Sequence, residues 1–449
     1  MRRLRPTSPS LYIDRHIRMT TPPQSQQPAQ QPAQSGSSRI GLGIVEFILT
    51  IALMTASISM GIDSMLPALP NIGQSLNVAN PNDTQLVIGV YFLGFGICQL
   101  FFGSLSDTYG RRYILLGGLA FYTVTLFAAA WSGSLFALLA MRFAQGVGAA
   151  AVRITTLAIV RDCFGGREMA RVMSYVMIVF MIMPMVAPFV GQMIVAYSNW
   201  QWIFILLGIV SAGLFLVAFF RMKETLPVEE RLPLSVASVL SGFKTVLTNR
   251  ITCGYMIGLT LYTGVICAYI VSVQQVFGEV YGLGDTFPIA FAATAAGTAV
   301  AQFANGYFVR SFGMRRISHA AMIVFTVLGA IGYIVGMFGQ PSFTFIYVLI
   351  SVMLMMFAVI TTNCMAISLE PMGHLAGTAA AITSSVSTTV GVLLGGIVGQ
   401  MFDGTAQPLL AGFTVFGLLS ILATLWAERG KLFTHPGDTP ALEPGMGHV

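Results

Sequence analysis

Charged residues inside long apolar stretches are the most conspicuous feature of this sequence. Asp63 lies near the end of the first stretch, and Arg142 and Arg153 lie within the fourth. Charged side chains in such stretches are costly in a membrane and generally face a cavity or a partner of opposite charge. Removing a carboxyl group from water favours its protonated form, which a proton carrier needs. Asp63 is therefore the main candidate for proton coupling. The alternative is a hydrated carboxylate that caps the Pro-rich turn after it.

Two arginines and a second acid could complete this site. Arg142 and Asp63 lie at similar depths when counted inward from the ends of their stretches, so we predict that they pair. Glu46, near the start of the first stretch, is a second proton-coupling candidate, unless its side chain extends to the membrane surface. Arg153 follows Arg142 by about three helical turns, nearly on the same face. It either attracts an anionic substrate into a cavity or forms a structural ion pair with Glu46.

Further polar groups inside apolar stretches are candidates for a substrate cavity. A largely apolar cavity with a few polar groups suits amphipathic or aromatic ligands. The alternative for each group is a hydrogen bond that packs one helix against another. The candidates, together with Arg153, are Gln145, Tyr262, Tyr269 and Asn363.

The fifth apolar stretch contains Pro184, Pro188 and Gly191. Two prolines remove backbone hydrogen bonds within a helix, and a small residue lets a neighbouring helix approach. We therefore predict a kink in this helix, with close packing beside it.

Composition identifies the elements that must position these residues. Of the 449 residues, 55% are hydrophobic and 9% are Asp, Glu, Lys or Arg, whereas soluble domains carry about 25% charged residues. The sequence therefore predicts an all-α membrane protein. Twelve apolar runs have about the 20 residues that a helix needs to cross a bilayer. They cover approximately 42–67, 84–103, 113–132, 135–160, 170–196, 201–220, 251–276, 287–308, 317–337, 343–364, 375–401 and 409–427.

Charge predicts the orientation of these runs. If the N-terminus is cytoplasmic, all 23 Lys and Arg residues except Arg142 and Arg153 fall in the tails, the central linker or the cytoplasmic turns. The charged residues in the outer loops are all acidic, for example Asp285 and Asp403. This distribution follows the positive-inside rule. We predict an integral membrane protein with both termini cytoplasmic, in the inner membrane if the cell is bacterial.

The chain divides into two similar halves. We predict a disordered cytoplasmic tail over 1–39, six-helix bundles over 40–220 and 251–427, a cytoplasmic linker over 221–250 and a second cytoplasmic tail over 428–449. A shift of 203 residues aligns four pairs in order: Gly94 with Gly297, Gln99 with Gln302, Gly103 with Gly306, and Gly110 with Gly313. Such parallel repeats are typical of transporters that bind substrate between their halves.

The sequence lacks the motifs of the main alternative classes. It has no phosphate-binding loop, zinc-ligand spacing or catalytic triad, and its five cysteines show no C-x-x-C spacing. We therefore expect that the protein is not an enzyme and uses no cofactor or metal. We expect a proton gradient to be its energy source. The expected partners are protons, a small-molecule substrate and the lipid bilayer, with no nucleic acid, and the chain is expected to be a monomer.

The hairpin between the second and third runs resembles a known signature. Its sequence, Gly103-Ser104-Leu105-Ser106-Asp107-Thr108-Tyr109-Gly110-Arg111-Arg112, is similar to the G-x-L-x-D-x-x-G-R-R/K motif of major facilitator superfamily transporters. The segment Arg142-x-x-Gln145-Gly146-x-Gly148 resembles the bicyclomycin/chloramphenicol-resistance branch of the twelve-span drug:proton antiporters. The segment around Pro184 and Pro188 resembles an exporter signature, G-P-x-x-G-G, with Ala187 and Gln192 where glycines are usual.

This resemblance implies two pseudo-symmetric six-helix halves, the major facilitator fold. It also implies a proton-coupled antiporter that exports small amphipathic or apolar compounds by alternating access. Two alternatives stay open: a proton-coupled importer of a small metabolite, and a non-transporting membrane receptor on the same fold.

The resemblance further implies a conformational latch at the hairpin. Asp107 would meet the start of the eleventh span near Ala376, where a helix N-terminus favours an anion. Arg111 or Arg112 would pair with Asp162. These contacts would join the halves when the cavity opens outward; the alternative is a plain basic turn. The residues implied are Gly103, Asp107, Gly110, Arg111, Arg112 and Asp162.

Overall fold

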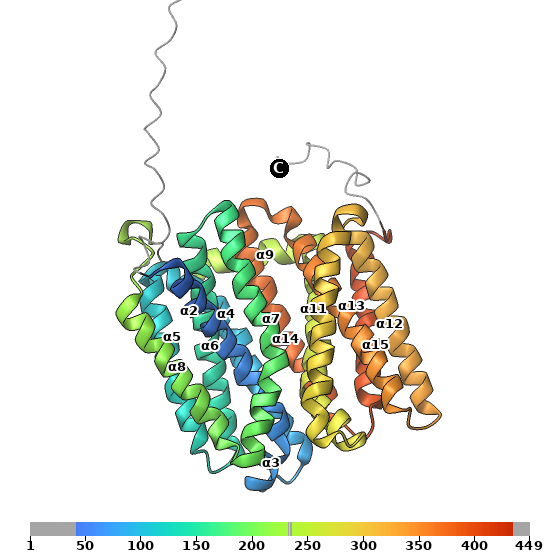
Figure 1. Cartoon of the computed structure of the whole chain (residues 1–449). Coiled ribbons are helices and arrows are strands. Elements are labelled where there is room, and N and C mark those ends of the chain that lie inside the picture. The colour runs from blue at the N-terminus through green and yellow to red at the C-terminus, as the bar shows by residue number, and fades with distance from the viewer. Residues whose placement is uncertain (1–41, 232, 234–235, 434–449) are drawn as a thin grey trace, which may run out of the picture. The chain divides into compact units, whose positions relative to one another are not determined.

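The computed structural model describes residues 42–231, 233 and 236–433, and all regular elements in these ranges are helices (Figure 1). Twelve helical segments in this part of the chain are long and apolar enough to cross a membrane. This confirms the predicted all-α membrane fold. The predicted tail over 1–39 and the end of the chain from 434 lie outside the described residues.

The N-terminal half contains six of these spans. They are α2 (Ile44–Asp63) extended by α3 (Leu69–Ser75), α4 (Leu86–Tyr109), α5 (Arg111–Ala130), α6 (Leu135–Cys163), α7 (Gly166–Tyr197) and α8 (Gln201–Arg221).

The C-terminal half contains the other six. They are α10 (Arg250–Gln274) extended by a π-helical turn (Gln275–Val280), α11 (Phe287–Phe312), α12 (Met314–Met337), α13 (Phe343–Leu369), α14 (Ala376–Gln400) and α15 (Gln407–Ala427).

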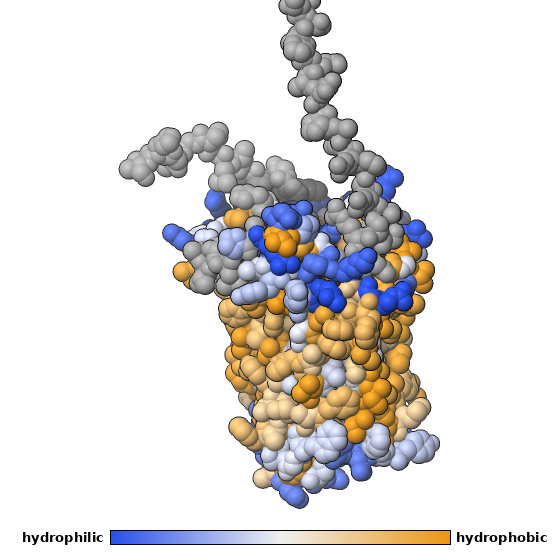
Figure 2. Space-filling view, turned by 90° about the vertical axis from the view of Figure 1, so that its left-hand side faces the viewer, coloured by the Kyte–Doolittle hydropathy of each residue, from blue (hydrophilic) through white to orange (hydrophobic). Residues whose placement is uncertain are grey.

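The described part of the chain begins and ends on the same side of the bundle, the upper side in Figure 1. We call it the basic side, because the hairpins and helix ends on it carry Arg111, Arg221 and Arg315. The space-filling view in Figure 2 shows a hydrophobic belt, with hydrophilic residues above it on the basic side and below it on the opposite side. Such a belt matches the hydrocarbon core of a bilayer.

Equivalent glycines turn the chain on the basic side of each half. Gly110 ends α4 with φ of 100°, and Gly313 ends α11 with φ of 79°. Residues with a side chain rarely adopt this backbone conformation, which explains why both positions are glycine. They are one of the pairs that the 203-residue shift aligns.

The linker between the halves contains a helix that we did not predict. This helix, α9 (Val236–Thr248), crosses the basic side of the bundle (Figure 1). Its Val246 is buried in a small cluster with Met256 of α10 and Ile382 of α14, and Phe243 packs against that cluster. The linker is therefore partly folded against the C-terminal half.

Candidate functional site

A cavity of about 1240 Å³ lies between the two halves. Its walls come from α2, α4, α6 and α7 of the N-terminal half and from α10, α11, α13 and α14 of the C-terminal half. The lining is mostly apolar, with hydroxyl and amide groups such as Thr294, Gln302 and Thr388. A volume of this size accommodates a drug-sized molecule.

The cavity extends to the basic side. Its lining includes Asp107 and Arg111 at the end of α4 and the start of α5, Arg161 near the end of α6, and Gly377 at the start of α14. All of these positions lie at helix ends on the basic side.

Amide side chains close the opposite side. The Asn82 amide donates to the backbone carbonyls of Gln400 (3.2 Å) and Phe402 (3.0 Å), and the Gln400 amide donates back to the Asn82 carbonyl (2.8 Å). Gln275 donates to the Asn82 side chain at 3.0 Å and also accepts a hydrogen bond from Gln85. We call these five residues the amide clasp. They join the two halves without charge, and our sequence analysis did not identify them.

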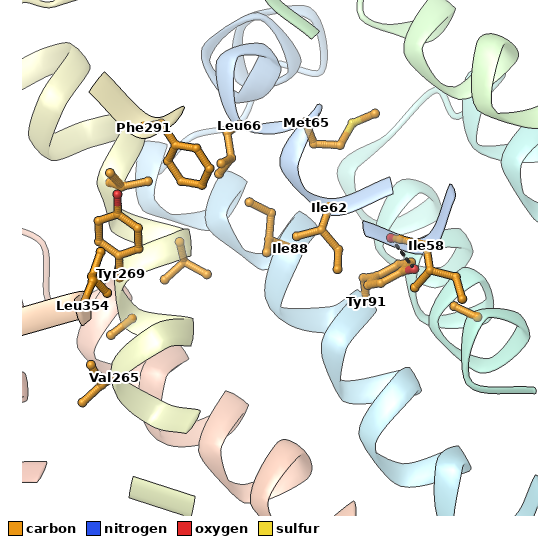
Figure 3. Close-up of a cluster of buried hydrophobic side chains, with 14 of the residues drawn as sticks. Ile58, Ile62, Met65, Leu66, Ile88, Tyr91, Val265, Tyr269, Phe291 and Leu354 are labelled. Carbon is orange, nitrogen blue, oxygen red and sulfur yellow. Dashed lines mark hydrogen bonds between the residues drawn. The ribbon is translucent and has the colours of Figure 1, made fainter. Parts of the chain in front are cut away.

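Apolar packing continues between the halves near the clasp. A single buried cluster contains Ile62 and Leu66 with Ile88 of α4 from the N-terminal half, and Tyr269 and Phe291 from the C-terminal half (Figure 3). The contact surface between the halves is therefore apolar beside the clasp.

Asp63 lines the cavity at the last turn of α2. Its side chain is buried, with 5% of the residue exposed, and one carboxylate oxygen accepts a hydrogen bond from Ser59 at 3.2 Å. Among the described residues Asp63 forms no ion pair. A buried acid that faces a cavity and has no fixed cation beside it can exchange a proton with water in the cavity.

The predicted pair between Asp63 and Arg142 is wrong in this conformation. The Arg142 side chain is fully buried and donates to the Val87 carbonyl (2.8 Å) and to Gln145 Oε1 (2.8 Å). Its guanidinium lies 4.5 Å from the centre of the Tyr91 ring, a cation–π contact. The guanidinium lies among carbonyl and aromatic groups behind the cavity wall, and its Nη2 atom has no hydrogen-bond partner among the described residues.

Of the other two charged candidates, Glu46 and Arg153, only Arg153 lines the cavity. Glu46 does not line the cavity and pairs with Arg221 at 2.9 Å between exposed side chains. It is therefore not part of the proton-coupling site that we propose below. Arg153 does line the cavity, and its guanidinium lies 5.2 Å from the Phe180 ring centre. The predicted structural pairing of Arg153 with Glu46 is absent.

Only one of the remaining predicted cavity residues lines the cavity. Tyr269 does so, and its hydroxyl bonds Thr294 Oγ1 at 2.9 Å. The other three do not line the cavity in this conformation, and their side chains face neighbouring helices instead. Gln145 bonds Arg142 and the Thr125 carbonyl, Tyr262 packs on Phe325, and Asn363 exchanges hydrogen bonds with Asn305.

For the helix with two prolines, α7, the structure shows the predicted close packing but does not test the predicted kink. α7 contains Pro184 and Pro188 without a break, and Pro184 lines the cavity. The kink stays a prediction. A Cβ atom at Gly191 would collide with the Ser64 carbonyl just after α2, so glycine permits the predicted close packing there.

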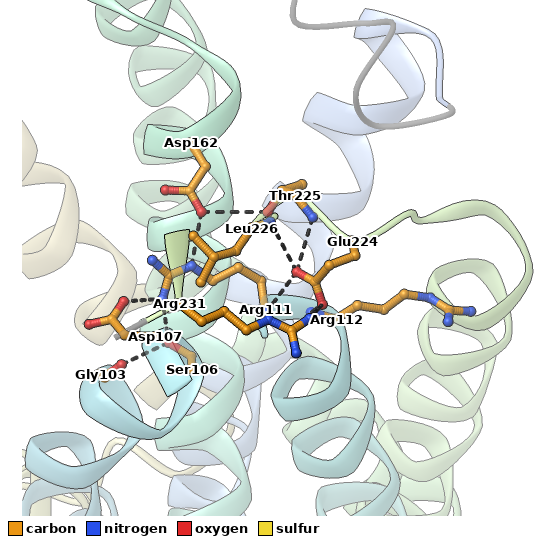
Figure 4. Close-up of polar contacts among 10 residues, drawn as sticks. All are labelled: Gly103, Ser106, Asp107, Arg111, Arg112, Asp162, Glu224, Thr225, Leu226 and Arg231. Atoms are coloured by element: carbon orange, nitrogen blue, oxygen red, sulfur yellow. Dashed lines mark hydrogen bonds and ion pairs between the residues drawn. The ribbon is translucent and has the colours of Figure 1, made fainter. Parts of the chain in front are cut away.

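The hairpin forms a polar network on the basic side (Figure 4). Arg111 Nε donates to Asp162 at 2.9 Å, which is the implied pair, and the same guanidinium bonds Asp107 and Ser106. Arg112 instead donates to the Phe219 carbonyl at 2.7 Å.

Asp107 does not hold the start of α14 in this conformation. Its carboxylate pairs with Arg111, and both Asp107 and Gly377 face the cavity. The cavity is open between them, so the contact implied for the outward-open state is not formed.

Glu224, which follows α8, completes the network and was not predicted. Its carboxylate accepts the backbone N–H groups of Arg111 (2.9 Å) and Arg112 (3.2 Å) at the start of α5. These donors have no partner within the helix, and a carboxylate there also complements the helix dipole. Glu224 therefore attaches the linker to the hairpin.

The C-terminal half repeats this cluster. Arg315 pairs with Glu370 and Glu428, each at 2.8 Å. Arg315 follows Arg111 by 204 residues (315 minus 111), and Glu428 follows Glu224 by the same number (428 minus 224). The repeat of charged residues in the sequence thus indicates both Glu224 and Glu428.

The comparisons with known proteins extend over most of the chain. A family model described as Major Facilitator Superfamily matches residues 51–396. The bicyclomycin resistance protein homolog of Haemophilus influenzae is 29% identical over 378 residues, covering 84% of this chain and 94% of that protein. Multidrug resistance protein D of Escherichia coli is 25% identical over 404 residues, covering 88% of this chain and 98% of that protein.

A solved structure shares the fold. It is a bacterial homolog of the human lysosomal transporter Spinster, in an inward-facing and occupied conformation. The TM-score is 0.64 at 11% sequence identity, over 85% of this chain and 96% of that chain. At this identity the similarity concerns the fold alone.

Proposed function

The chain belongs to the Major Facilitator Superfamily, and from this premise we propose that it is a proton-coupled antiporter that exports small amphipathic or apolar compounds by alternating access. The members of this family are transporters and not enzymes, and the relatives include proteins named for bicyclomycin and multidrug resistance. The observation that carries the proposal is the position of Asp63 on the wall of a cavity that both halves line, as a buried acid that pairs with no cation in the described part of the chain.

We propose that the basic side faces the cytoplasm, because lysine and arginine concentrate in cytoplasmic loops. The described conformation is then open to the cytoplasm, and the amide clasp is the closed outer gate. In a bacterium the membrane would be the inner membrane.

A transport cycle follows from these contacts. Substrate enters the cavity from the cytoplasm, the clasp around Asn82 separates, and Asp107 closes on the start of α14. Asp63 then takes up a proton from outside, and the proton-loaded protein returns to the inward-open state. Asp63 then releases its proton to the cytoplasm, and the proton gradient drives the cycle because one proton moves inward as substrate moves outward.

The experiment is dye transport in everted membrane vesicles with an imposed proton gradient. We expect accumulation of amphipathic dyes that a protonophore abolishes, and at least a tenfold loss of gradient-driven transport in Asp63→Asn. Glu46→Gln is the matched control: it removes a carboxylate of the same helix outside the cavity, so transport should persist.

The other outcomes decide between the alternatives. Gradient-driven transport by Asp63→Asn equal to that of the wild type would remove Asp63 from the mechanism. Movement of substrate together with protons would support the importer. Absence of any substrate or proton flux in liposomes that contain purified protein would support the receptor.

A further inference from the structure

Two arginines of α6 form a basic stripe along the cavity wall. Arg153, Leu157 and Arg161 all line the cavity. They are spaced four residues apart, and residues at this spacing share one face of a helix. Arg161 lies near the end of α6 on the basic side, and Arg153 lies about 12 Å deeper at a rise of 1.5 Å per residue. The stripe therefore runs from the cavity mouth to its interior.

The two arginines of this stripe have no acidic partner among the described residues. The other charged side chains on the cavity wall are Asp63, Asp107 and Arg111. Arg111 is already paired with Asp107 and Asp162. The positive charge of the stripe is thus available to a ligand.

We propose that this cavity prefers amphipathic organic anions, such as aromatic carboxylates, with the anionic group on Arg153 and the aromatic body beside Phe180. This rests on the proposed transport function and assigns its substrate class. Arg161 attracts the anion to the mouth of the cavity, and Arg153 binds it.

The chemistry of Arg153 fits this role. A guanidinium binds a carboxylate through two parallel hydrogen bonds, while its position near the Phe180 ring leaves an aromatic surface beside the bound head group. Alternating access also requires the cavity to close over this charge. A cation sealed inside a membrane protein without a partner is costly, so a bound anion favours closure of the cavity in the export step.

The anion site is separate from the proton site. Tyr91 connects the end of α2 to Arg142: it donates to the Ile58 carbonyl at 3.2 Å and lies over the guanidinium of Arg142. Arg153 lies about 16 Å farther along α6 from Arg142, whereas Asp63 lies beyond Ile58 in the opposite direction. Arg153 and Asp63 therefore lie at different depths of the same cavity wall.

The test is equilibrium binding to the full chain in phosphatidylcholine nanodiscs. The probes are 2-naphthoate, the neutral 2-naphthamide and the cationic 2-naphthylmethylammonium, which share one aromatic body. We expect the wild type to bind the anion about tenfold more tightly than the amide. Arg153→Gln should remove this preference and leave amide binding unchanged, which also shows that the cavity is intact. Arg153→Lys should keep part of the preference.

Two further variants separate binding from attraction. Arg161→Gln should keep the equilibrium affinity for 2-naphthoate within about twofold but slow its association at low salt, because a charge at the mouth acts on the encounter rate. Arg171→Gln removes the same charge from the basic side outside the cavity lining. It should change neither quantity.

The proposal is overturned if the three probes bind equally, if the cation binds best, or if Arg153→Gln keeps the preference for the anion. Failure of the transport proposal gives a different result. In that case vesicles show no proton-driven flux while the anion preference and its loss in Arg153→Gln persist. Proton-driven flux without any anion preference would contradict the present inference alone.

Discussion

At the residue scale, two buried charges in neighbouring spans have different surroundings. Asp63 faces the cavity and has one hydrogen bond from Ser59, whereas Arg142 is enclosed by the Val87 carbonyl, Gln145 and the Tyr91 ring. The first arrangement leaves a group free to change its charge. The second surrounds a charge that never changes, since guanidinium stays protonated. We infer that Arg142 holds α6 to α4 and takes no direct part in proton transfer.

Substitution of Arg142 should therefore reduce stability first. Arg142→Met removes the hydrogen bond to the Val87 carbonyl and leaves Gln145 Oε1 without its donor, and an unsatisfied buried group costs about 1–3 kcal/mol. We expect a lower midpoint of thermal unfolding in detergent, with Arg171→Met at an exposed position as the control. An unchanged midpoint would show that these hydrogen bonds contribute nothing.

At the element scale, the contact between α4 and α6 depends on small residues. A Cβ atom at Gly146 would collide with the Tyr91 carbonyl, and one at Gly94 would collide with the Phe143 carbonyl. The two backbones are thus too close for any side chain at these positions. This contact positions Arg142 behind the cavity wall.

A single methyl group should separate these helices. Gly146→Ala is expected to cost about 1–3 kcal/mol through overpacking and to lower the thermal midpoint. Gly117→Ala on α5 is the matched control, because a Cβ atom there has no heavy atom within 4 Å. It should be neutral or slightly stabilising. Equal effects of both substitutions would contradict the role of close packing.

The amide clasp acts between elements of the two halves. It contains no ion pair, so its strength should depend little on salt. Each of its hydrogen bonds contributes about 0.5–1.5 kcal/mol, and together they can shift a two-state equilibrium between inward-open and outward-open forms.

Asn82→Ala should move the population toward the outward-open form by about tenfold, since it removes several of these bonds. Spin labels at Trp131 and Phe338, on the opposite side of the two halves, would report this as a longer distance. Asn71→Ala, an exposed amide on α3, is the control. A distance distribution identical to that of the wild type would exclude the clasp as a gate.

At the scale of the whole molecule, the two halves repeat one design on the basic side. Arg111 pairs with Asp162 near Glu224, and Arg315 pairs with Glu370 and Glu428. In each half an arginine at the start of the third span meets an acid at or just after the end of the fourth. A further acid follows the sixth span.

This symmetry requires both hairpins to lie on one side of the membrane. Cysteines placed at the exposed positions Tyr109 and Phe312 should react with an impermeant maleimide in everted vesicles, and a cysteine at Phe338 should react only in right-side-out vesicles. Labelling of Tyr109 and Phe312 from different sides would disprove the two-half arrangement and the proposed function that depends on it.

The sequence by itself determined the twelve spans, the two halves, the hairpin and the position of Asp63 within a span. These features are local: the length and hydropathy of a run decide whether it crosses a membrane, and a carboxylate is conspicuous in an apolar run. The pair between Arg111 and Asp162 was also accessible, through the resemblance to a known motif.

Only the tertiary structure decided which partner each polar residue meets. A membrane helix is apolar on all sides, so its sequence pattern does not distinguish the face toward a cavity from the face toward a neighbouring helix. Gln145, Tyr262 and Asn363 therefore appeared equivalent to Tyr269 in the sequence, although only Tyr269 lines the cavity. The clasp joins Asn82 to Gln400 across more than 300 residues of chain, and such contacts arise only when the two halves pack together.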